Sequence, residues 1–438
     1  MKKISFIIIS FALTCGMVFA SGSQSQSTAT TAGGVIQVSI PSYKTGQNVG
    51  ALFFLPQVER FNAKYAGKYK LVIEEIVQDM YAEKMQQLSQ QNKLPALVEG
   101  GNQAWIEQYI IPGNRFVDLK PWLDSKPDLK ARLIPAALDY NTKGGKLFSL
   151  PSPVVRPVGI YWNPKLYSPS RSFADMTWDQ VIAELGDNKI AFMTSENAWT
   201  TMLVYSSLIA TQPGGPELMA SSITRKITDY NNPIFVNATR QLQTLLSQHA
   251  SANTLGAAYA DAANAFMSMR AALIANGSWM VGDFAPEQSG KWSNGFNGAD
   301  VRAGVLPGNI GIGGTGIGYS YWIPSTATPQ EQEVAKAFLE FIYSPEELEA
   351  FMLSEGGSVP RMTPSADFLA KRTQNRLLAE YDGAVNERTI LCDSFESAVP
   401  NSISQSEFPR LLPDLISGRL SPEQFCKELT DRAAEIEL

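Results

Sequence analysis

Gly144–Tyr167 has the sequence GGKLFSLPSPVVRPVGIYWNPKLY, and the rest of the chain is best interpreted outward from it. It contains two strand-like runs, Lys146–Leu150 and Val158–Trp162, separated by three prolines between residues 151 and 157. Proline fixes the backbone angle φ and has no N–H to donate, so it belongs at strand ends and in rigid connections. The segment therefore predicts a passage of the chain from one β-sheet to another.

The composition is that of a large, acidic, globular protein. A chain of 438 residues is too long for one ordinary domain, and a prior of about 150 residues per domain suggests two or three. Hydrophobic residues make up 44% and charged residues 18%, which indicates a substantial core. The net charge is −6, and it becomes −8 if Lys2 and Lys3 leave with a leader. This balance argues against nucleic acid or an anionic membrane surface as the main partner.

The first residues are typical of a secretory signal peptide, which we expect to span residues 1–20. Two lysines precede the apolar run Ile4–Leu13, and Val18-Phe19-Ala20 is a suitable cleavage site. The apolar run is too short to span a membrane comfortably. Export would place the mature chain in the periplasm, after a polar stretch, residues 21–34, that should form a disordered tether.

Each of the three cysteines leaves an alternative open. Lipid attachment at Cys15 is an alternative to cleavage after Ala20, although Leu13 stands two residues before this cysteine and bacterial lipoproteins have leucine three before. Cys392 and Cys426 could form a disulfide in an oxidising compartment, or they could be two buried free thiols.

Strands and helices alternate after the tether. Val35–Ile40, Tyr69–Val77 and Leu94–Val98 are strand-like, and Ala82–Asn92 is helical. Such alternation implies βαβ units, a mostly parallel sheet with helices on both faces, and a ligand site beyond the carboxyl ends of the strands. Later, Thr177 is a suitable N-cap for a helix, and 279–284 (WMVGDF) is strand-like.

Two further segments resemble passages between sheets. They are Val301–Leu306, which leads to Pro307-Gly308, and Gly356–Arg361, with the sequence GGSVPR. Together with the opening segment they predict three crossings between two lobes.

Short motifs follow one another in an order that resembles a known family. They are the Gly-Lys-aromatic-x-x-Pro and Tyr-x-Asn elements of the opening segment, Thr177-Trp178-Asp179, Gly277-Ser278-Trp279, Gly313-Gly314 and the helix Val334–Phe341. This series is similar to the extracellular solute-binding proteins of ABC transporters, family 1, which bind sugars or glycerol 3-phosphate. The resemblance implies a two-lobe α/β fold of the class II periplasmic-binding-protein type, with three inter-lobe crossings and a ligand cleft between the lobes.

The resemblance also implies the domain boundaries and the partners. The N-lobe would comprise residues 35–151 and 306–357, and the C-lobe residues 152–305 and 358–438. We expect a monomer without cofactor, metal or catalytic residues. It would capture a small solute of the sugar or polyol-phosphate class by hinge closure and deliver it to the transmembrane subunits of an ABC permease.

Candidate ligand contacts come from the resemblance and from the residues themselves. The resemblance implies Tyr81, Ser278, Gly313 and Gly314, with Asn102 at a position where relatives have an acidic contact. Aromatic rings at strand-end loops can meet the C–H face of a sugar, although each could equally be an ordinary core or rim residue. These rings are Tyr43, Tyr81, Trp105, Trp199 and Trp279.

Arg156 is the one charged residue in the proline-rich passage. Its planar guanidinium could grip a carboxylate, a phosphate or a pair of sugar hydroxyls. Alternatively, it forms a salt bridge that holds the hinge. The arginine with which glycerol-phosphate-binding relatives grip phosphate has no counterpart at Ser402–Ser404.

Catalytic motifs are scarce. His249 is the only histidine, which nearly excludes histidine-based triads and histidine-rich metal sites. Gly311–Gly316 matches a dinucleotide-binding fingerprint, but we expect a strand after it where the fingerprint needs a helix. The alternative function is a secreted carbohydrate-active enzyme that uses paired carboxylates, for instance Asp283 with Glu287.

Overall fold

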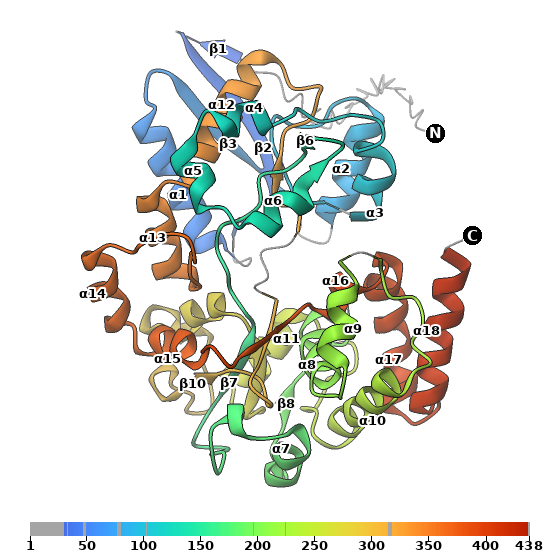
Figure 1. The fold of residues 1–438 in the computed structure, drawn as a ribbon. Coiled ribbons are helices and arrows are strands. Elements are labelled where there is room, and N and C mark those ends of the chain that lie inside the picture. Colours follow the sequence, from blue (N-terminus) through green and yellow to red (C-terminus); the bar gives the residue numbers. More distant parts are fainter. Residues whose placement is uncertain are drawn as a thin grey trace, which may run out of the picture.

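The computed structural model describes residues 30–436, except residues 33, 47–49, 77–79, 102, 196, 224 and 314–317. In this part of the chain the polypeptide forms two lobes joined by extended segments (Figure 1). The expected signal peptide, Cys15 and residues 21–29 of the expected tether lie outside the described residues. Residues 30–32 of that tether are not irregular, because they form the short strand β1 (Thr30–Ala32).

The upper lobe in Figure 1 is built on a parallel strand pair. β2 (Val35–Ser42) runs parallel to β3 (Tyr69–Glu75), in register from Ile36 opposite Tyr69 to Ser42 opposite Glu75. β1 adds to β2 in the antiparallel sense. These strands confirm the prediction for residues 35–40 and, over residues 69–75, the strand predicted at 69–77, whose last residue lies outside the described residues. The strand predicted at 94–98 is shorter and lies later, as β4 (Val98–Glu99), which pairs with β12 (Tyr321–Trp322).

Helices cover this lobe and supply most of its aromatic core. Phe61 of α1 (Ala51–Lys64) meets Phe338 of α12 (Pro329–Ile342) edge to face, with ring centroids 5.2 Å apart. Edge-to-face contact is a favoured geometry for aromatic pairs. The remaining elements are α2 (Tyr81–Gln90), α3 (Gln103–Trp105), the π-helix Ile106–Ile110, α4 (Lys120–Asp124), α5 (Pro127–Arg132), α6 (Pro135–Asn141), β5 (Thr142–Lys143), β6 (Lys146–Leu147) and α13 (Pro345–Glu355).

The lower lobe has a four-stranded sheet in the order β10-β7-β9-β8. β7 (Gly159–Trp162) is antiparallel to β9 (Leu273–Asn276) and to β10 (Arg302–Gly304), whereas β8 (Ile190–Ala191) is parallel to β9. A second, two-stranded sheet pairs β11 (Ile310–Ile312) with β13 (Ile390–Cys392).

Helices surround these strands. α7 (Trp178–Leu185) begins with the predicted Thr177 cap, whose side chain forms a capping box with Gln180. α8 (Trp199–Ala210) is buried almost all round. The others are α9 (Gly215–Ser221), α10 (Pro233–Gln248), α11 (Tyr259–Met267), α14 (Ala366–Gln374), α15 (Arg376–Ala384), α16 (Phe395–Ala398), the π-helix Ile403–Glu407, α17 (Phe408–Ile416) and α18 (Pro422–Ile436).

Two sequence predictions for this lobe are wrong. The strand-like WMVGDF lies in a 3-10 helix, Ser278–Phe284, which starts as soon as β9 ends at Asn276. Val301–Leu306 is not a passage, because it contains β10, which is hydrogen-bonded to β7. Since β10 and β11 both pair with strands of the lower lobe, the boundary expected between residues 305 and 306 does not fit the strand pairing. Gly313 is still bound to the lower lobe through the Cys392 carbonyl oxygen, and the carbonyl oxygen of Gly318 already accepts a hydrogen bond from Asn141 of the upper lobe.

The first passage lies where the proline-rich segment predicts it. Leu150 still bridges to Tyr321 of the upper lobe, whereas Val158 bridges to Ile312 of the lower one. The third passage, at Gly356–Arg361, runs beside the first. The backbone N–H groups of Val155 and Ser358 each donate to the other residue's carbonyl oxygen, at 2.8 and 2.9 Å.

Both remaining cysteines are buried free thiols, so the disulfide alternative does not apply to this structure. Burial raises the pKa of Cys392 to about 12 and that of Cys426 to about 11. In the described part of the chain no helix is both long and apolar enough to cross a membrane.

The tight β7–β10 pairing makes Gly159 a test of the lower sheet. A Cβ atom at Gly159 would overlap the backbone carbonyl oxygen of Gly304. We expect Gly159→Ala to lower the free energy of unfolding by about 2 kcal/mol, measured by urea denaturation. Gly383→Ala is the matched control, because a Cβ atom there has no heavy atom within 4 Å. Equal stabilities for the two variants would contradict the strand register.

Candidate functional site

A cavity of about 900 Å³ lies between the two lobes. Its walls come from both lobes and from the passages that join them. The upper wall includes Tyr43, Lys44, Phe53, Glu99, Tyr321, Tyr343 and Phe351. The lower wall includes Met193, Asn197, Trp199, Tyr259, Trp279 and Glu396. The hinge side is formed by Ser152, Val154, Arg156 and Glu355.

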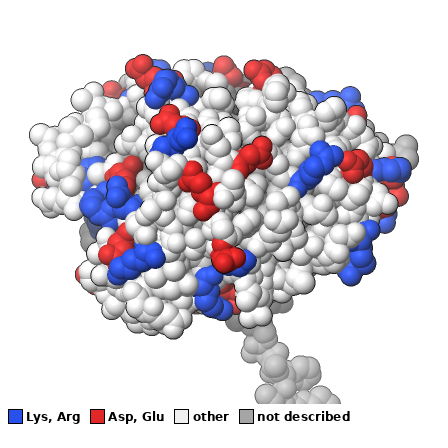
Figure 2. Space-filling view, turned by 90° about the horizontal axis from the view of Figure 1, so that it is seen from below, with Lys and Arg blue, Asp and Glu red and all other residues white. Residues whose placement is uncertain are grey.

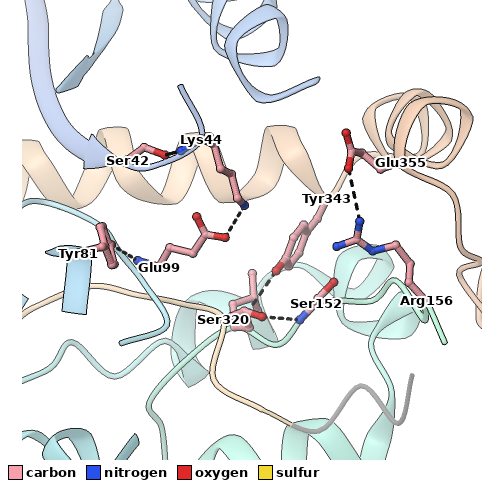
Figure 3. A network of polar contacts seen from close by, with 10 residues as sticks. Ser42, Lys44, Tyr81, Glu99, Ser152, Arg156, Ser320, Tyr343 and Glu355 are labelled. Atoms are coloured by element: carbon pink, nitrogen blue, oxygen red, sulfur yellow. Dashed lines mark hydrogen bonds and ion pairs between the residues drawn. The ribbon is translucent and has the colours of Figure 1, made fainter. Parts of the chain in front are cut away.

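The upper wall carries an ion pair at the ends of two strands. Lys44 follows β2 and forms a salt bridge with Glu99, the last residue of β4 (Figure 3). The Lys44 backbone N–H donates to the Ser42 hydroxyl at 3.1 Å, and the Glu99 N–H donates to the Tyr81 hydroxyl at 3.0 Å. Burial is the largest single effect and lowers the pKa of Lys44, but the charge of Glu99, the neighbouring Tyr43 and the hydrogen bond to Glu99 together raise it above its ordinary value. Lys44 is therefore a firmly charged, paired cation.

Tyrosines surround this ion pair and remain protonated. The negative charge of Glu99, followed by burial, raises the pKa of Tyr43. Burial first and Glu99 second raise the pKa of Tyr81 and Tyr321. These hydroxyls are thus neutral groups that can both donate and accept hydrogen bonds.

The hinge side carries a second ion pair. Arg156 Nη1 lies 3.6 Å from Glu355 Oε2, at the point where α13 ends and the third passage begins (Figure 3). Its guanidinium also lies over two rings, 5.0 Å from the centroid of Trp279 and 4.8 Å from that of Phe351. Burial lowers the pKa of Arg156, and burial raises the pKa of Glu355 in spite of the nearby arginine. Arg156 therefore contacts Trp279 of the lower lobe and Phe351 of the upper lobe.

The lower wall is aromatic. Trp199 is the first residue of α8, Tyr259 is the first residue of α11, and Trp279 belongs to the 3-10 helix after β9. The ring centroid of Trp199 lies 5.7 Å from the ring centroid of Trp279 and 6.4 Å from that of Tyr259. Ala198, immediately before α8, has a left-handed backbone with φ of 50°, which is uncommon for a residue with a Cβ atom.

The predicted site residues fall into three groups. Tyr43, Arg156, Trp199 and Trp279 line the cavity together. Asn102 and Gly314 lie outside the described residues. The others are placed elsewhere, as follows.

Tyr81 is buried behind Tyr43, with ring centroids 5.4 Å apart. Ser278 is fully buried and donates to the carbonyl oxygen of Glu355 at 2.6 Å. Gly313 donates its N–H to the Cys392 carbonyl oxygen at 2.7 Å, at the end of β11. Trp105 packs against Trp322 in the upper core. Direct ligand contact by any residue of the predicted set stays a prediction.

Several residues that line the cavity are not among the site residues predicted from the sequence. Lys44, Glu99, Tyr321, Tyr343 and Glu355 all line the cavity. The sequence could have indicated Glu99 as a site residue, because it directly follows the apolar run Leu94–Val98 and so stands at the carboxyl end of a predicted strand. Glu355 directly precedes the glycine pair of the third passage.

The carboxylate pair considered for hydrolysis does not line the cavity. Asp283 forms an ion pair with Lys291 at 2.9 Å, and Glu287 is exposed. Within the described residues, no group of histidine, cysteine, aspartate or glutamate side chains could hold a metal ion.

Comparison with known proteins gives one family and a set of solved structures. The family model of bacterial extracellular solute-binding proteins matches residues 57–376. A structure of a chitin oligosaccharide binding protein is similar at a TM-score of 0.71 and 20% identity, covering 91% of this chain and 98% of the other. The structure of a Streptococcus pneumoniae solute-binding protein in complex with the blood group A-trisaccharide has a TM-score of 0.67 and 16% identity, covering 91% of this chain and 98% of the other.

A third structure comes from work on xylan utilisation by the thermophilic bacterium Caldanaerobius polysaccharolyticus. It gives a TM-score of 0.71 and 16% identity, covering 91% of this chain and 100% of the other. At these identities the structures establish the fold. No curated protein sequence matches the chain significantly.

The raised pKa of Glu355 predicts a pH dependence. The folded protein holds this proton more tightly than the unfolded chain, so Glu355 contributes most stability below its ordinary pKa of 4.5. That contribution is lost as the pH rises through the folded-state pKa. Glu355→Gln has no such proton, so its stability relative to the wild type should improve between about pH 4 and about pH 7.5 in urea unfolding.

The control for this pH series is Glu59→Gln, on the exposed side of α1. Over the same pH range Glu355→Gln should gain stability relative to Glu59→Gln as well as to the wild type. A stability difference between Glu355→Gln and the wild type that does not change with pH would show that the buried position does not affect proton binding.

Proposed function

This chain belongs to the bacterial extracellular solute-binding proteins, and we propose that it captures a neutral carbohydrate for an ABC importer. The observation that carries the proposal is the inter-lobe cavity. It combines aromatic rings with two ion pairs, in each of which a carboxylate neutralises the cation. Sugar recognition needs flat apolar surface for the C–H faces of the rings and polar groups for the hydroxyls. Trp199 and Tyr259 offer the first, and the neutral tyrosines of the upper wall offer the second.

The charges of the cavity favour an uncharged ligand over a glycerol phosphate. Lys44 and Arg156 are the cations among the described residues that line it, and each has a carboxylate partner. Glu396 lines the cavity as well, and it accepts a hydrogen bond from Gln405 at 2.7 Å. A phosphate would have to displace a carboxylate from its cation, whereas a neutral hydroxyl can join an existing pair.

The neighbours support the carbohydrate class. Three of these similar structures are connected with chitin oligosaccharide, a blood group trisaccharide and xylan utilisation. We infer the same broad class for this chain, since it shares their fold over nine-tenths of its length and adds an aromatic cavity of suitable size.

Closure of the two lobes would trap the ligand and signal its presence. Three segments join the lobes, so a small change in their backbone angles can move one lobe against the other. We propose that the closed form, as a monomer in the periplasm or on a lipid anchor, delivers the ligand to the membrane subunits of the importer. Figure 2 shows acidic and basic side chains interspersed over the face seen from below, in keeping with a partner other than nucleic acid.

A ligand panel tests the neutral-carbohydrate proposal. We expect at least one of xylotriose, chitotriose and maltotriose to bind in calorimetry and to change the tryptophan fluorescence, and glycerol 3-phosphate not to bind. Because a neutral ligand has no charge to be screened, its Kd should change less than about twofold between low and high salt. Binding of glycerol 3-phosphate alone would contradict the proposal, and chromatography that detects hydrolysis products would favour an enzyme.

A second experiment separates the two roles considered for Arg156. Among the described residues its guanidinium has no hydrogen bond, so its N–H groups can serve a ligand. In Arg156→Met combined with Glu355→Gln, neither charge is left buried alone, and the thermal midpoint should stay within about 3 °C of the wild type. The affinity for the best saccharide of the panel should fall about tenfold. Unchanged affinity with a large loss of stability would assign Arg156 to the hinge alone.

A further inference from the structure

The ring of Trp279 is largely enclosed by protein groups. The Arg156 guanidinium lies over it, and the Trp199 ring lies beside it at an interplanar angle of 36°. Backbone also closes on the ring, because a Cβ atom at Gly277 would overlap its six-membered part. A sugar that stacked on Trp279 would have to displace these neighbours. The ring is therefore a poor stacking platform, although the sequence suggested that role.

The indole N–H of Trp279 differs from those of Trp178 and Trp322 in its hydrogen bonding. Trp178 donates to the Ser207 hydroxyl at 2.9 Å, and Trp322 donates to the Gly100 carbonyl oxygen at 2.8 Å. Trp279 Nε1 is buried but has no hydrogen-bond partner in the described part of the chain. Leaving a buried donor unpaired is costly, and native proteins rarely accept that cost without a reason.

We propose that Trp279 binds the ligand through its indole N–H, which donates a hydrogen bond to an oxygen of the saccharide. Trp279 lines the cavity, and its enclosed ring holds the N–H in one orientation. Stacking is then left to Trp199 and Tyr259 of the same wall. This inference rests on the proposed function and adds a specificity-determining contact to it. The acceptor is either a hydroxyl or ether oxygen, as in xylotriose, or an acetamido carbonyl oxygen, as in chitotriose.

Two changes remove the donor while keeping an aromatic ring. Trp279→Phe keeps a face for Arg156, and benzothienylalanine at position 279 keeps the bicyclic shape with sulfur in place of the N–H. Trp122→Phe, in the upper core, is the control for a tryptophan exchange far from the cavity. We expect both changes at position 279 to weaken binding of the tightest neutral trisaccharide about tenfold and Trp122→Phe to leave it unchanged.

A spectroscopic readout separates hydrogen bonding from a general loss of packing. In protein labelled with ¹⁵N-tryptophan, the indole N–H signal that is absent from the Trp279 variants should move downfield when the trisaccharide binds. Comparing chitotriose with xylotriose identifies the acceptor, because binding of chitotriose alone points to the acetamido carbonyl, whereas binding of xylotriose points to a hydroxyl or ether oxygen.

The outcomes that would overturn this inference differ from those that would overturn the proposed function. If the wild type binds a trisaccharide, and the benzothienylalanine variant binds it equally well with no shift of the indole signal in the wild type, Trp279 is not a ligand donor, although the protein still binds carbohydrate. If the wild type binds none of the saccharides, both proposals fail.

Discussion

The close approach of the first and third passages is the constraint on which the cleft depends. Val155 and Ser358 exchange two backbone hydrogen bonds, which holds the two segments side by side. Gly357 makes this possible, since its φ is 89° and a Cβ atom there would come within 2.7 Å of the Val155 carbonyl oxygen. The contact places Arg156 next to Glu355 and between aromatic rings of the two lobes. The backbone contact between Val155 and Ser358 thus fixes the hinge side of the cavity. It also positions the Arg156 side chain, which contacts both lobes.

The α/β architecture places the charged groups of the upper wall at the ends of strands. Lys44 follows a strand of the upper lobe and Glu99 ends another, so two residues far apart in sequence form one ion pair at the cavity edge. The aromatic residues Trp199 and Tyr259 stand at the first positions of helices in the lower lobe. The Lys44–Glu99 ion pair and its tyrosine hydroxyls thus belong to the upper wall, whereas the Trp199, Tyr259 and Trp279 rings belong to the lower wall. A ligand that bridges the lobes has to satisfy both.

Local patterns predicted the parts of this arrangement that depend on local chemistry. The prolines of the first passage, the Thr177 cap and the strands β2 and β3 follow from φ restriction, capping and alternation over a few residues. The sequence could not reveal that Arg302–Gly304 pairs with β7, because that contact joins segments far apart in the chain, and a short strand followed by Pro307-Gly308 resembles a passage. The ion pairs of Lys44 and Arg156 also depend on tertiary contacts. The 3-10 helix that carries Trp279 resembles a strand in sequence because its apolar residues are compatible with both structures.

The threading of the chain has a consequence for the order of folding. Phe61 of the upper core packs against Phe338, and β11 of the lower lobe pairs with β13, so neither lobe is a continuous piece of the polypeptide. Contacts of such large sequence separation carry a high loop-closure entropy and slow the formation of a native core. An emerging chain can form α1 and the β2–β3 pair early, but it cannot complete either core until residues beyond 300 are available. The threading that provides several connections at the hinge therefore delays folding until most of the chain has been made.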